Sequence, residues 1–339
     1  MISRQWCIAR RPVGNVKDGD CVIAEEPVPD LEDGQILLKV LYLGLVPVMR
    51  MYMLGIKPTD DPAQDIGDVV HGRAVAQVLQ SRHPNYEPGD FVQGQTGWQT
   101  YKVTSVTPQE RFLKLRHMDL PLSYGISVLS MIGYTAYFGF MECASAKLGD
   151  TMVISGAGGG VGSLVIQMAR MRGCRIIGIT GGSAKAKFVQ DLGCDETIDH
   201  RADDIDRKLT ELCPNGIDVY FDNVGGDILN TCLNHLALGA RIVQCGSISE
   251  YMLDEPYGLT NYTNLRHANA SMTGYFVYNY LDRFVEAEDQ LADWIRSGDL
   301  KPVEDIAESF EQMPAALSRL YDGTNHGIQI CHVADPDVI

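Results

Sequence analysis

A glycine-rich loop between a strand-like run and a helical run is the feature that most constrains the fold of this chain. The loop reads SGAGGGVGS (155–163); TMVIS (151–155) precedes it and SLVIQMARMR (163–172) follows it. Glycines in that context let the backbone turn tightly and approach a pyrophosphate, which then lies on the N–H groups of the helix N-terminus. An ordinary turn is the alternative, but the flanking strand and helix favour a nucleotide-binding loop.

The spacing of these glycines departs from the common G-x-G-x-x-G pattern. If the pattern starts at Gly156, its third glycine falls on Val161. The loop instead contains G-x-x-G-x-x-G, formed by Gly156, Gly159 and Gly162. The spacing alone therefore does not identify a nucleotide-binding loop, and the evidence for one comes from the flanking strand and helix.

Strand-like and helical segments alternate from about residue 126 to residue 297. RIIGIT (175–180), IDVYFDN (217–223) and ARIVQCGS (240–247) are strand-like, with the helical runs AKAKFVQDLG and ILNTCLNHLA in the two intervals. Such alternation predicts a parallel, doubly wound sheet. A last helix is expected in LDRFVEAEDQLADWIRSG (281–298), with an apolar stripe of Leu281, Phe284, Val285, Leu291, Trp294 and Ile295.

The beginning and the end of the chain are strand-like instead. QILLKVLYLGL (35–45) and VVHGRAVAQVL (69–79) are separated by turns rich in Pro, Gly and Asp, which predicts an all-β domain through residue 125. The tail from KPVEDIAESF to GIQICHV returns to strand-like text. We expect that tail to complete the first domain, which would make it discontinuous.

Charge and cysteine content exclude several classes of partner. A formal net charge of −16 disfavours nucleic acid and anionic membranes, which need a surface rich in Lys and Arg. The nine cysteines are scattered and form no C-x-x-C pair, which is typical of reduced thiols. MISRQWCIARRP lacks the apolar core of a signal peptide, and no apolar run is long enough to span a bilayer. We therefore expect a cytoplasmic protein with a small-molecule ligand.

The residues after the second strand of the alternating region indicate the cofactor. A site that prefers NAD normally carries Asp or Glu there, which accepts hydrogen bonds from the ribose hydroxyls. GGSAKAK follows RIIGIT, contains no acidic residue and offers Lys185. A cation can bind a 2′-phosphate, so the sequence predicts NADPH. Alternatively, Lys185 is a solvated residue in the first turn of a helix.

Taken together, the motifs resemble a known family. In chain order they are RQWCIARRPVG, EEPVP, LYLGLVPVMR, GWQTYKV, GYTAYFGF, the glycine loop, GGSAK, YFDNVGG, CGSISEY, YLDRF and GTNHG. This order is similar to that of the zinc-free branch of the medium-chain dehydrogenase/reductase superfamily, with its leukotriene/prostaglandin, plant double-bond and curcumin-type reductases. The resemblance implies a homodimer of α/β chains, each with a Rossmann NADP-binding domain over 126–299 and a GroES-like β domain over 1–125, completed by 300–339.

The same resemblance implies the residues of the cofactor site. The branch commonly spells its loop A-x-x-G-x-x-G, which accounts for the spacing found here, with Gly159, Gly160, Val161 and Gly162 at the pyrophosphate. Lys185 is implied at the 2′-phosphate, and His200 stands where a tyrosine usually touches the adenosine phosphate. The remaining cofactor-lining positions are Asn223, Cys245, Gly246, Ser247, Ser249, Tyr251, Tyr275, Phe276, Val277 and Asn325.

Zinc ligands are missing where alcohol dehydrogenases of the superfamily carry them. LGLVPVMRMY contains neither Cys nor His, and His71 is followed by Gly72 and Arg73 rather than by an acid. A lone histidine is more often structural than a ligand. We therefore expect no metal, and hydride transfer to a carbon that needs no Lewis acid.

Reduction of the carbon–carbon double bond of an α,β-unsaturated ketone or aldehyde meets that condition. Hydride adds to the β-carbon, and charge collects on the carbonyl oxygen as an enolate that needs a hydrogen-bond donor. Tyr251 occupies the position where the family places such a tyrosine, so it is the candidate for enolate stabilisation or proton donation. Alternatively it only packs against the nicotinamide, while a ribose hydroxyl or water supplies the proton. Tyr262 is a weaker substrate candidate, on position alone.

Four residues depart from the family pattern. They affect the identity of the expected substrate more than the class of reaction. Val48 replaces a tyrosine that often faces the substrate, Ile132 replaces a proline, His200 replaces a tyrosine and Ile328 replaces a lysine. Arg201, beside His200, offers a compensating charge. Two other functions stay open: a zinc-free NADPH quinone oxidoreductase, since quinones are conjugated carbonyls too, and a nucleotide-binding sensor without turnover.

Overall fold

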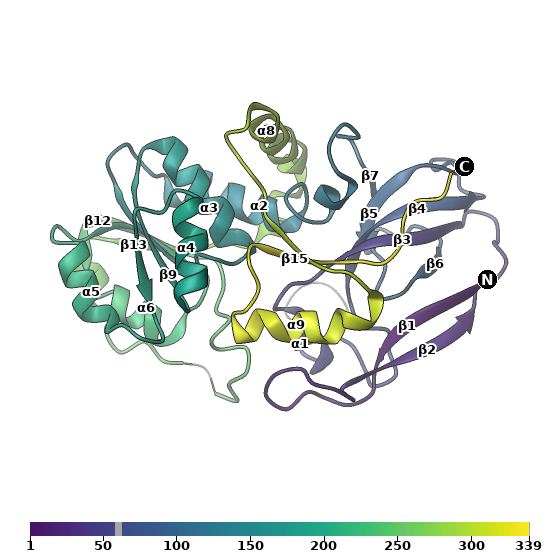
Figure 1. The fold of residues 1–339 in the computed structure, drawn as a ribbon, viewed down its shortest axis with the longest axis horizontal. Helices are drawn as coiled ribbons and strands as arrows, with labels where there is room; N and C mark the ends of the chain where they lie inside the picture. The colour runs from purple at the N-terminus through teal and green to yellow at the C-terminus, as the bar shows by residue number, and fades with distance from the viewer. Residues whose placement is uncertain (58–62, 256, 339) are drawn as a thin grey trace. The chain divides into compact units, whose positions relative to one another are not determined.

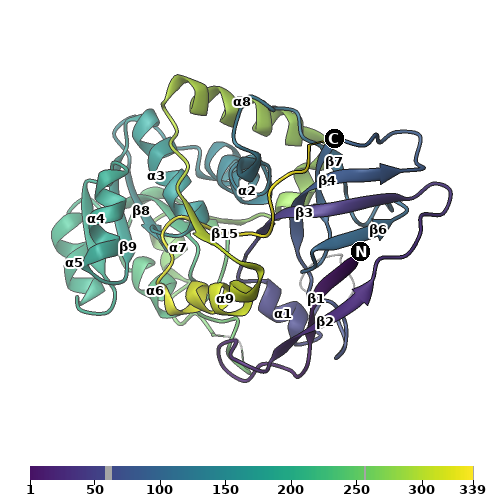
Figure 2. The ribbon, with the colours of Figure 1, turned by 45° about the vertical axis from the view of Figure 1, so that its right-hand side comes forward.

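The computed structural model describes residues 1–57, 63–255 and 257–338. They form two compact units. Unit 1 comprises Met1–Ser127, Asp305–Thr324 and Gln329–Ile339; unit 2 comprises Val128–Glu304 and Asn325–Ile328. The strands of each unit can be followed in Figure 1 and, from a second direction, in Figure 2.

Two short segments that we expected in the β domain belong to unit 2. The side chain of Gln167 donates to the carbonyl oxygen of Lys301 at 3.1 Å and accepts from its backbone N–H at 2.8 Å. The backbone N–H of Gly327 donates to the carbonyl oxygen of Gly158 at 2.9 Å. These long-range contacts tie both segments to the glycine loop and the helix after it, and no local sequence pattern announces them.

Unit 1 is built on a seven-stranded sheet. Its order is β14 (Glu304–Ala307), β15 (Ile328–His332), β3 (Ile36–Gly44), β4 (Arg73–Ser81), β5 (Phe91–Gln95) and β7 (Leu113–Lys114), with β6 (Tyr101–Thr104) also paired to β3. β1 (Ile2–Ile8) and β2 (Cys21–Pro27) form a separate antiparallel pair. Neighbouring residues on opposite faces of β3 are both buried, as Leu37 and Leu38 show, which explains why QILLKVLYLGL is almost continuously apolar. The helical elements in this part are α1 (Met49–Met53), η1 (Leu122–Gly125), η4 (Phe310–Gln312) and α9 (Met313–Asp322).

The tail that we expected to be strand-like contains the helix α9. Its apolar side packs into the unit 1 core through Met313, Ala316 and Leu317, at the three- and four-residue spacing of a helix face. A proline stands at its first positions and Gly323 ends it with φ of +65°. This combination of proline at the start and glycine after the end was a readable helix signal.

Unit 2 contains the predicted doubly wound sheet. Its strand order is β10 (Glu196–Asp199), β9 (Arg175–Thr180), β8 (Thr151–Ser155), β11 (Ile217–Asp222), β12 (Leu236–Gln244) and β13 (Ser271–Gly274), and neighbouring strands are parallel. The order reverses between β8 and β11. In open α/β sheets, ligands bind outside the carboxyl ends of the strands at such a switch point.

The helices of unit 2 largely follow the predicted alternation. They are α2 (Met131–Phe138), the π-helix η2 (Gly139–Ala144), α3 (Gly160–Arg172), α4 (Ser183–Asp191), α5 (Ile205–Leu212), α6 (Gly226–Cys232), α7 (Asn264–His267), η3 (Val277–Arg283) and α8 (Phe284–Ser297). α5 and α6 pack on the sheet through Leu209, Leu229 and Cys232. The helical run expected through ILNTCLNHLA stops early, because a turn in which the His235 N–H donates to the Cys232 carbonyl at 3.0 Å leads straight into β12.

The apolar stripe predicted for the last helix is partly wrong. Phe284 and Leu291 are buried, whereas Leu281 is 48% and Val285 is 53% exposed. Leu281 lies in the 3₁₀ segment η3 before the helix begins, and Val285 follows Phe284 by one residue and so points off the packed face. Phe284 anchors the helix through Tyr134 of α2, with 4.7 Å between ring centroids.

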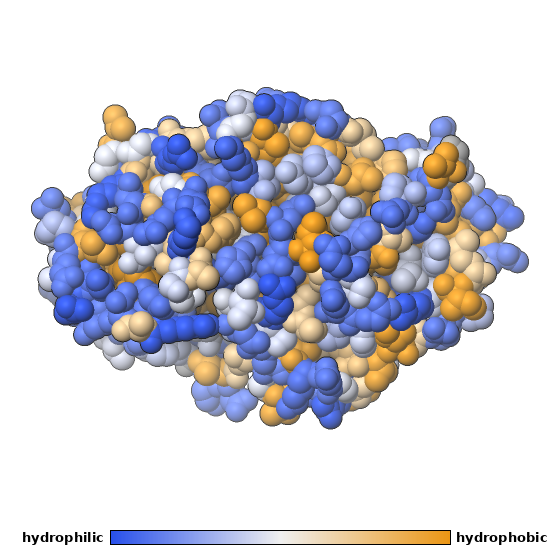
Figure 3. Space-filling view, in the orientation of Figure 1, coloured by the Kyte–Doolittle hydropathy of each residue, from blue (hydrophilic) through white to orange (hydrophobic). Residues whose placement is uncertain are grey.

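The surface carries no unusual concentration of apolar residues on the face drawn in Figure 3, where hydrophobic and hydrophilic residues are interspersed. All nine cysteines are free thiols. No helix in the described ranges combines the length and apolar character needed to cross a membrane.

Candidate active site

The glycine loop turns sharply because two of its glycines are sterically required. Gly156 has φ of +58°, in the left-handed region. A Cβ atom at Gly162 would overlap the carbonyl oxygen of Gly156, so the first turn of α3 packs directly on the loop. The N–H of Gly159 donates to that same oxygen at 2.9 Å. Gly160 and Val161 then open α3, whose N-terminal N–H groups and helix dipole attract an anion.

Lys185 lies against this loop rather than in solvent. Its residue is only 8% exposed. A Cβ atom at Gly158 would lie 2.5 Å from Cγ of Lys185, so the aliphatic stem crosses the loop where a side chain is missing. The ammonium group donates to Oδ1 of Asn325 at 3.4 Å. The alternative of a solvated first-turn lysine is therefore wrong, while the phosphate contact stays a prediction.

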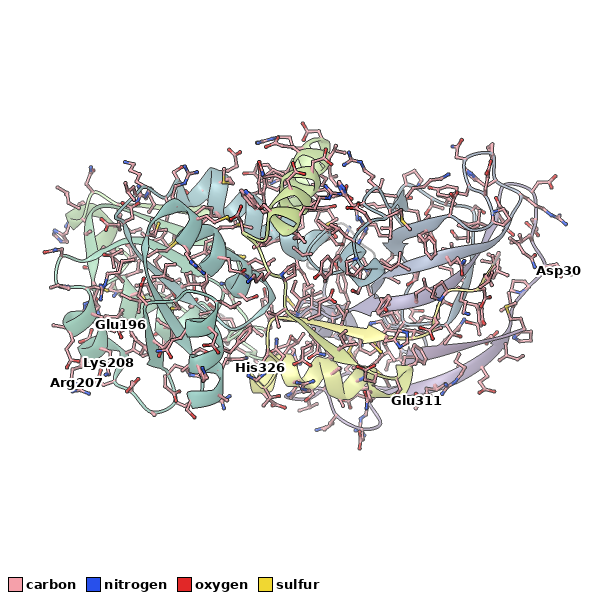
Figure 4. The ribbon with its side chains drawn as sticks, turned by 45° about the horizontal axis from the view of Figure 1, so that its top comes forward. Asp30, Glu196, Arg207, Lys208, Glu311 and His326 are labelled. Atoms are coloured by element: carbon pink, nitrogen blue, oxygen red, sulfur yellow. The ribbon has the colours of Figure 1, made fainter. Side chains whose placement is uncertain are left out.

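The segment around Asn325 completes one side of the loop. Gly327 forms a parallel bridge with Gly159, and the Asn325 side-chain amide donates to the Gly327 carbonyl at 3.1 Å. His326, labelled in Figure 4, packs edge-on against Phe188 of α4 with 5.4 Å between ring centroids. Asn325 is thus held beside Lys185 by backbone pairing and by side-chain packing.

Two of the departures from the family pattern meet at Gly160. A Cβ atom at this glycine would lie 3.2 Å from Cγ2 of Ile132 and 3.5 Å from Cγ1 of Ile328. Ile328 is fully buried. Apolar packing thus occupies this side of the helix N-terminus, where the family usually has a lysine.

The carboxylate of Asp222, at the end of β11, connects neighbouring loops. The side chain is fully buried, and its Oδ1 accepts from the hydroxyls of Ser155 and Tyr220, both at 2.8 Å. The backbone N–H groups of Val224 and Gly225 donate to the same oxygen at 3.1 and 3.0 Å. Burial raises the pKa of Asp222, and the hydrogen bonds from Gly225, Ser155, Tyr220 and Val224 oppose the rise. All of these donors are neutral groups, so their number rather than a counter-charge stabilises the ion.

The main chain around Asp222 extends this connection to β12. Its carbonyl oxygen accepts from the N–H groups of Cys245 and Gly246 at 2.9 and 3.1 Å. Asn223 is fixed to the first strand of the site: its N–H donates to the Ser155 hydroxyl at 2.9 Å, and its side-chain amide donates to the Ser155 carbonyl at 2.8 Å. The ends of β8, β11 and β12 therefore form one hydrogen-bonded junction.

Ser155 and Asp222 are members of the site that we did not predict. The available signal was a polar residue ending each of two apolar strands, TMVIS and IDVYFD. Because carboxyl ends of adjacent parallel strands lie at the same sheet edge, that pattern places the two side chains close together.

Tyr251 belongs to the loop that follows β12. Burial raises the pKa of its phenol, while hydrogen bonds from the backbone N–H and the hydroxyl of Ser247 act in the opposite direction. The phenol therefore stays protonated near neutral pH. The loop itself is held by Ser249, whose N–H and hydroxyl donate to the Val224 carbonyl at 3.1 and 2.6 Å, and by Glu250, whose carboxylate accepts from the Gly226 N–H at 3.1 Å.

Cys245 and Tyr275 form a second, partly buried contact at this end of the sheet. The Tyr275 hydroxyl lies 2.6 Å from the Thr135 carbonyl oxygen and 3.4 Å from Sγ of Cys245. Burial raises the pKa of Cys245 to about 12, so the thiol is not a thiolate nucleophile at neutral pH. Phe276 is 37% exposed, and Val277 begins η3.

His200 and Arg201 lie at the other flank of the loop, directly after β10. A Cβ atom at Gly181, the residue after β9, would lie 2.9 Å from both Nε2 of His200 and Nε of Arg201. The predicted adenosine-phosphate residue is thus brought together with a second basic side chain.

The two substrate candidates belong to different units. Tyr262, in unit 2, is 62% exposed. Val48, in unit 1, is half-buried before α1, and its carbonyl accepts from the Met51 N–H at 2.9 Å. Their contact with a substrate stays a prediction.

His71 has a structural explanation. Its ring stacks on Tyr52 with 4.1 Å between centroids. Within the described ranges, no group of three or more His, Cys, Asp or Glu side chains is arranged to hold a metal ion.

The fold and this site define a class of protein: a dinucleotide-binding oxidoreductase with a β domain attached. Residues 4–112 match the family model described as the N-terminal domain of oxidoreductase, and residues 160–296 match the model described as zinc-binding dehydrogenase. The chain belongs to the medium-chain dehydrogenase/reductase superfamily, in its zinc-free branch.

Relatives of known name cover nearly the whole chain. The NADPH-dependent curcumin reductase of Escherichia coli is 35% identical over 99% of this chain and 98% of its own length. The NADP(+)-dependent 2-alkenal reductase of Nicotiana tabacum is 36% identical over 88% of this chain and 87% of its own. Among solved structures, CurA from Vibrio vulnificus in complex with NADPH superposes with a TM-score of 0.90, at 35% identity over 98% of this chain and 100% of that one.

Replacement of Asp222 tests the junction at the strand ends. Asp222→Ala leaves two hydroxyls and two N–H groups without their acceptor, so we expect the free energy of unfolding to fall by about 3 kcal/mol or more. Tyr220→Phe is the matched control, because it removes one donor and should cost only about 1 kcal/mol. Urea denaturation followed by circular dichroism measures both. Equal losses for the two variants would contradict a central role of the carboxylate.

Proposed function

We propose that the protein is an NADPH-dependent reductase of the carbon–carbon double bond of α,β-unsaturated ketones and aldehydes. The observation that carries the proposal is the buried Lys185 against the glycine loop, after the strand where an NAD site carries an acid. The family membership supports it, because relatives include a curcumin reductase and a 2-alkenal reductase that are named as NADPH- or NADP-dependent.

The residues of unit 2 fit such a cofactor. Gly159 and Gly160 carry no side chains at the start of α3, where backbone N–H groups can approach a pyrophosphate. The hydroxyl of Thr180 at the end of β9 is buried and lacks a hydrogen-bond partner in the described part of the chain. The residues proposed to hold NADPH are Gly156, Gly159, Gly160, Val161, Gly162, Lys185, His200, Asn223, Cys245, Gly246, Ser247, Ser249, Tyr251, Tyr275, Phe276, Val277 and Asn325.

The chemistry needs a donor at the substrate oxygen. Bound NADPH supplies the hydride, which in this reaction is accepted by the β-carbon of the enone. We assign Tyr251 to the carbonyl oxygen, because burial keeps its phenol protonated and able to donate as negative charge develops there. The α-carbon then takes a proton from Tyr251 or from water. Val48, where the family usually has tyrosine, would leave room for a larger apolar substituent, and Tyr262 is proposed as a second substrate contact.

We also propose a homodimer that works in the cytoplasm. β13 is an edge strand of the unit 2 sheet and pairs only with β12 among the described residues. An open strand edge is a ready partner for another chain. Nine free thiols fit a reducing compartment. Sedimentation at micromolar concentration measures the assembly, and a monomer there would reject the dimer.

Lys185→Met tests the preference for NADPH. Methionine keeps an aliphatic stem against Gly158 but removes the charge, so we expect the KM for NADPH to rise about tenfold or more while the KM for NADH stays unchanged. Lys185→Ala, which also removes the stem, should add a loss common to both cofactors. An equal loss for both cofactors in the methionine variant would refute the assignment to the 2′-phosphate.

Tyr251→Phe tests the enolate donor. Removal of one oxyanion donor should lower kcat by about 100-fold or more, with NADPH affinity retained. Single-turnover kinetics with an enone measure the step directly, and tryptophan fluorescence quenching measures cofactor binding. Turnover near the wild-type rate would remove Tyr251 from the chemistry.

A substrate panel tests the function as a whole. Enones, enals and quinones are incubated with NADPH or NADH, and the products are identified by mass. A saturated carbonyl compound is the expected product; a hydroquinone with no enone turnover would favour the quinone oxidoreductase, the second candidate. Cofactor binding without oxidation of NADPH by any of these compounds would favour a sensor.

A further inference from the structure

The carboxyl end of β9 gathers polar groups that the fold alone does not require. His200 and Arg201 converge on Gly181 from the turn after β10, and a Cβ atom there would meet both side chains at 2.9 Å. Thr180, the residue before Gly181, is 3% exposed, and its Oγ1 lacks a hydrogen-bond partner within the described ranges.

The backbone holds the two basic residues in place. The His200 N–H donates to the Thr180 carbonyl at 2.9 Å, and the Arg201 N–H donates to Oδ1 of Asp199 at 3.0 Å. Hydrogen bonds from the N–H groups of Gly182 and Arg201 lower the pKa of Asp199, so its carboxylate is ionised and fixes the two turns to one another. Hydrogen bonds of the main chain at the ends of β9 and β10 therefore position His200 and Arg201.

We propose that His200 takes up a proton when the 2′-phosphate of NADPH binds beside the His200 and Arg201 side chains. The proposal rests on the proposed function for the identity of the cofactor. It adds that the affinity for NADPH depends on pH through a residue of this chain, which a tyrosine at the same position could not provide.

The charges around His200 give the direction of this dependence. Partial removal from water lowers the pKa of His200; Arg201 and Lys185 lower it further, and Asp199 raises it. The imidazole of the free protein is therefore mostly neutral at pH 7. A phosphate dianion favours the imidazolium and raises the pKa in the complex. NADPH affinity is then greatest at low pH and falls as the pH rises through the His200 pKa of the complex.

Isothermal titration calorimetry measures this linkage without turnover. Titrating NADPH at pH 7 into two buffers of different ionisation enthalpy should reveal an uptake of about half a proton, and Kd should rise about three- to fivefold between pH 6.5 and 8.5. The range starts at 6.5 because a phosphomonoester itself titrates near pH 6. NADH, which lacks the phosphate, should show neither effect.

Variants identify the group that titrates. His200→Gln should abolish both the proton uptake and the pH dependence, and Arg201→Gln should weaken NADPH about tenfold with NADH unchanged. His235→Gln is the matched control: His235 precedes β12, and its ring contacts Asp206 of α5 at 2.8 Å, away from the carboxyl ends of the strands. In the His235→Gln variant, the Kd for NADPH should depend on pH as it does in the unaltered protein.

Two failures can be told apart. Tighter binding of NADPH than of NADH without proton uptake, or uptake that persists in His200→Gln, overturns this inference and leaves the proposed function intact. Equal binding of NADPH and NADH overturns the proposed cofactor. Circular dichroism of each variant ensures that a lost effect does not come from a lost fold.

Discussion

A buried carboxylate surrounded by neutral donors is the constraint on which the candidate site depends. An ionised group in a protein interior is tolerated only when hydrogen bonds replace its lost hydration. Asp222 obtains them from two hydroxyls and two N–H groups, and its carbonyl oxygen holds the start of the loop after β12. The same residue therefore fixes the position of Asn223 and of the loop that carries Tyr251. Loosening it would disturb groups after three strands that we propose line the cofactor.

Local charge at the glycine loop opposes the charge of the whole molecule. A chain with a net charge of −16 repels an anionic cofactor at long range, but salt screens this repulsion beyond about 10 Å. Near the loop, the N-terminus of α3, Lys185, Arg201 and His200 all favour an anion. Salt screens short-range, partly buried contacts less, so these contacts dominate the electrostatic part of cofactor binding. The net charge of the chain bears only on partners such as nucleic acids and anionic membranes.

Local patterns were sufficient for the sheet of unit 2 and insufficient for the contacts that make the site. The strands TMVIS, RIIGIT and IDVYFD and the loop between the first strand and its helix follow from periodicity and glycine spacing. The burial of Lys185 could not be predicted in this way, because it depends on the missing side chain of Gly158 and on Asn325, which is far away in the sequence. Val285 was wrongly predicted to lie on the buried face of its helix. It follows the buried Phe284 by one residue, which turns its side chain away from the core. The missing acid after RIIGIT and the presence of Lys185 predicted NADPH, and family resemblance supplied the role of Tyr251, which no periodicity encodes.

The ionisable groups at the two ends of the site differ in how they respond to pH. Burial raises the pKa values of Asp222, Cys245, Tyr251 and Tyr275 near the ends of β11, β12 and β13. The thiol and the phenols there keep their protons throughout the neutral range, in surroundings of low polarity where a hydrogen bond to a developing oxyanion is strengthened. At the end of β9, by contrast, the His200 imidazole lies at the surface, and partial removal from water and the charge of Arg201 lower its pKa in the free protein. If Tyr251 and His200 act as proposed, the donor at the substrate keeps its proton across this range, and pH acts on recognition of the cofactor through His200.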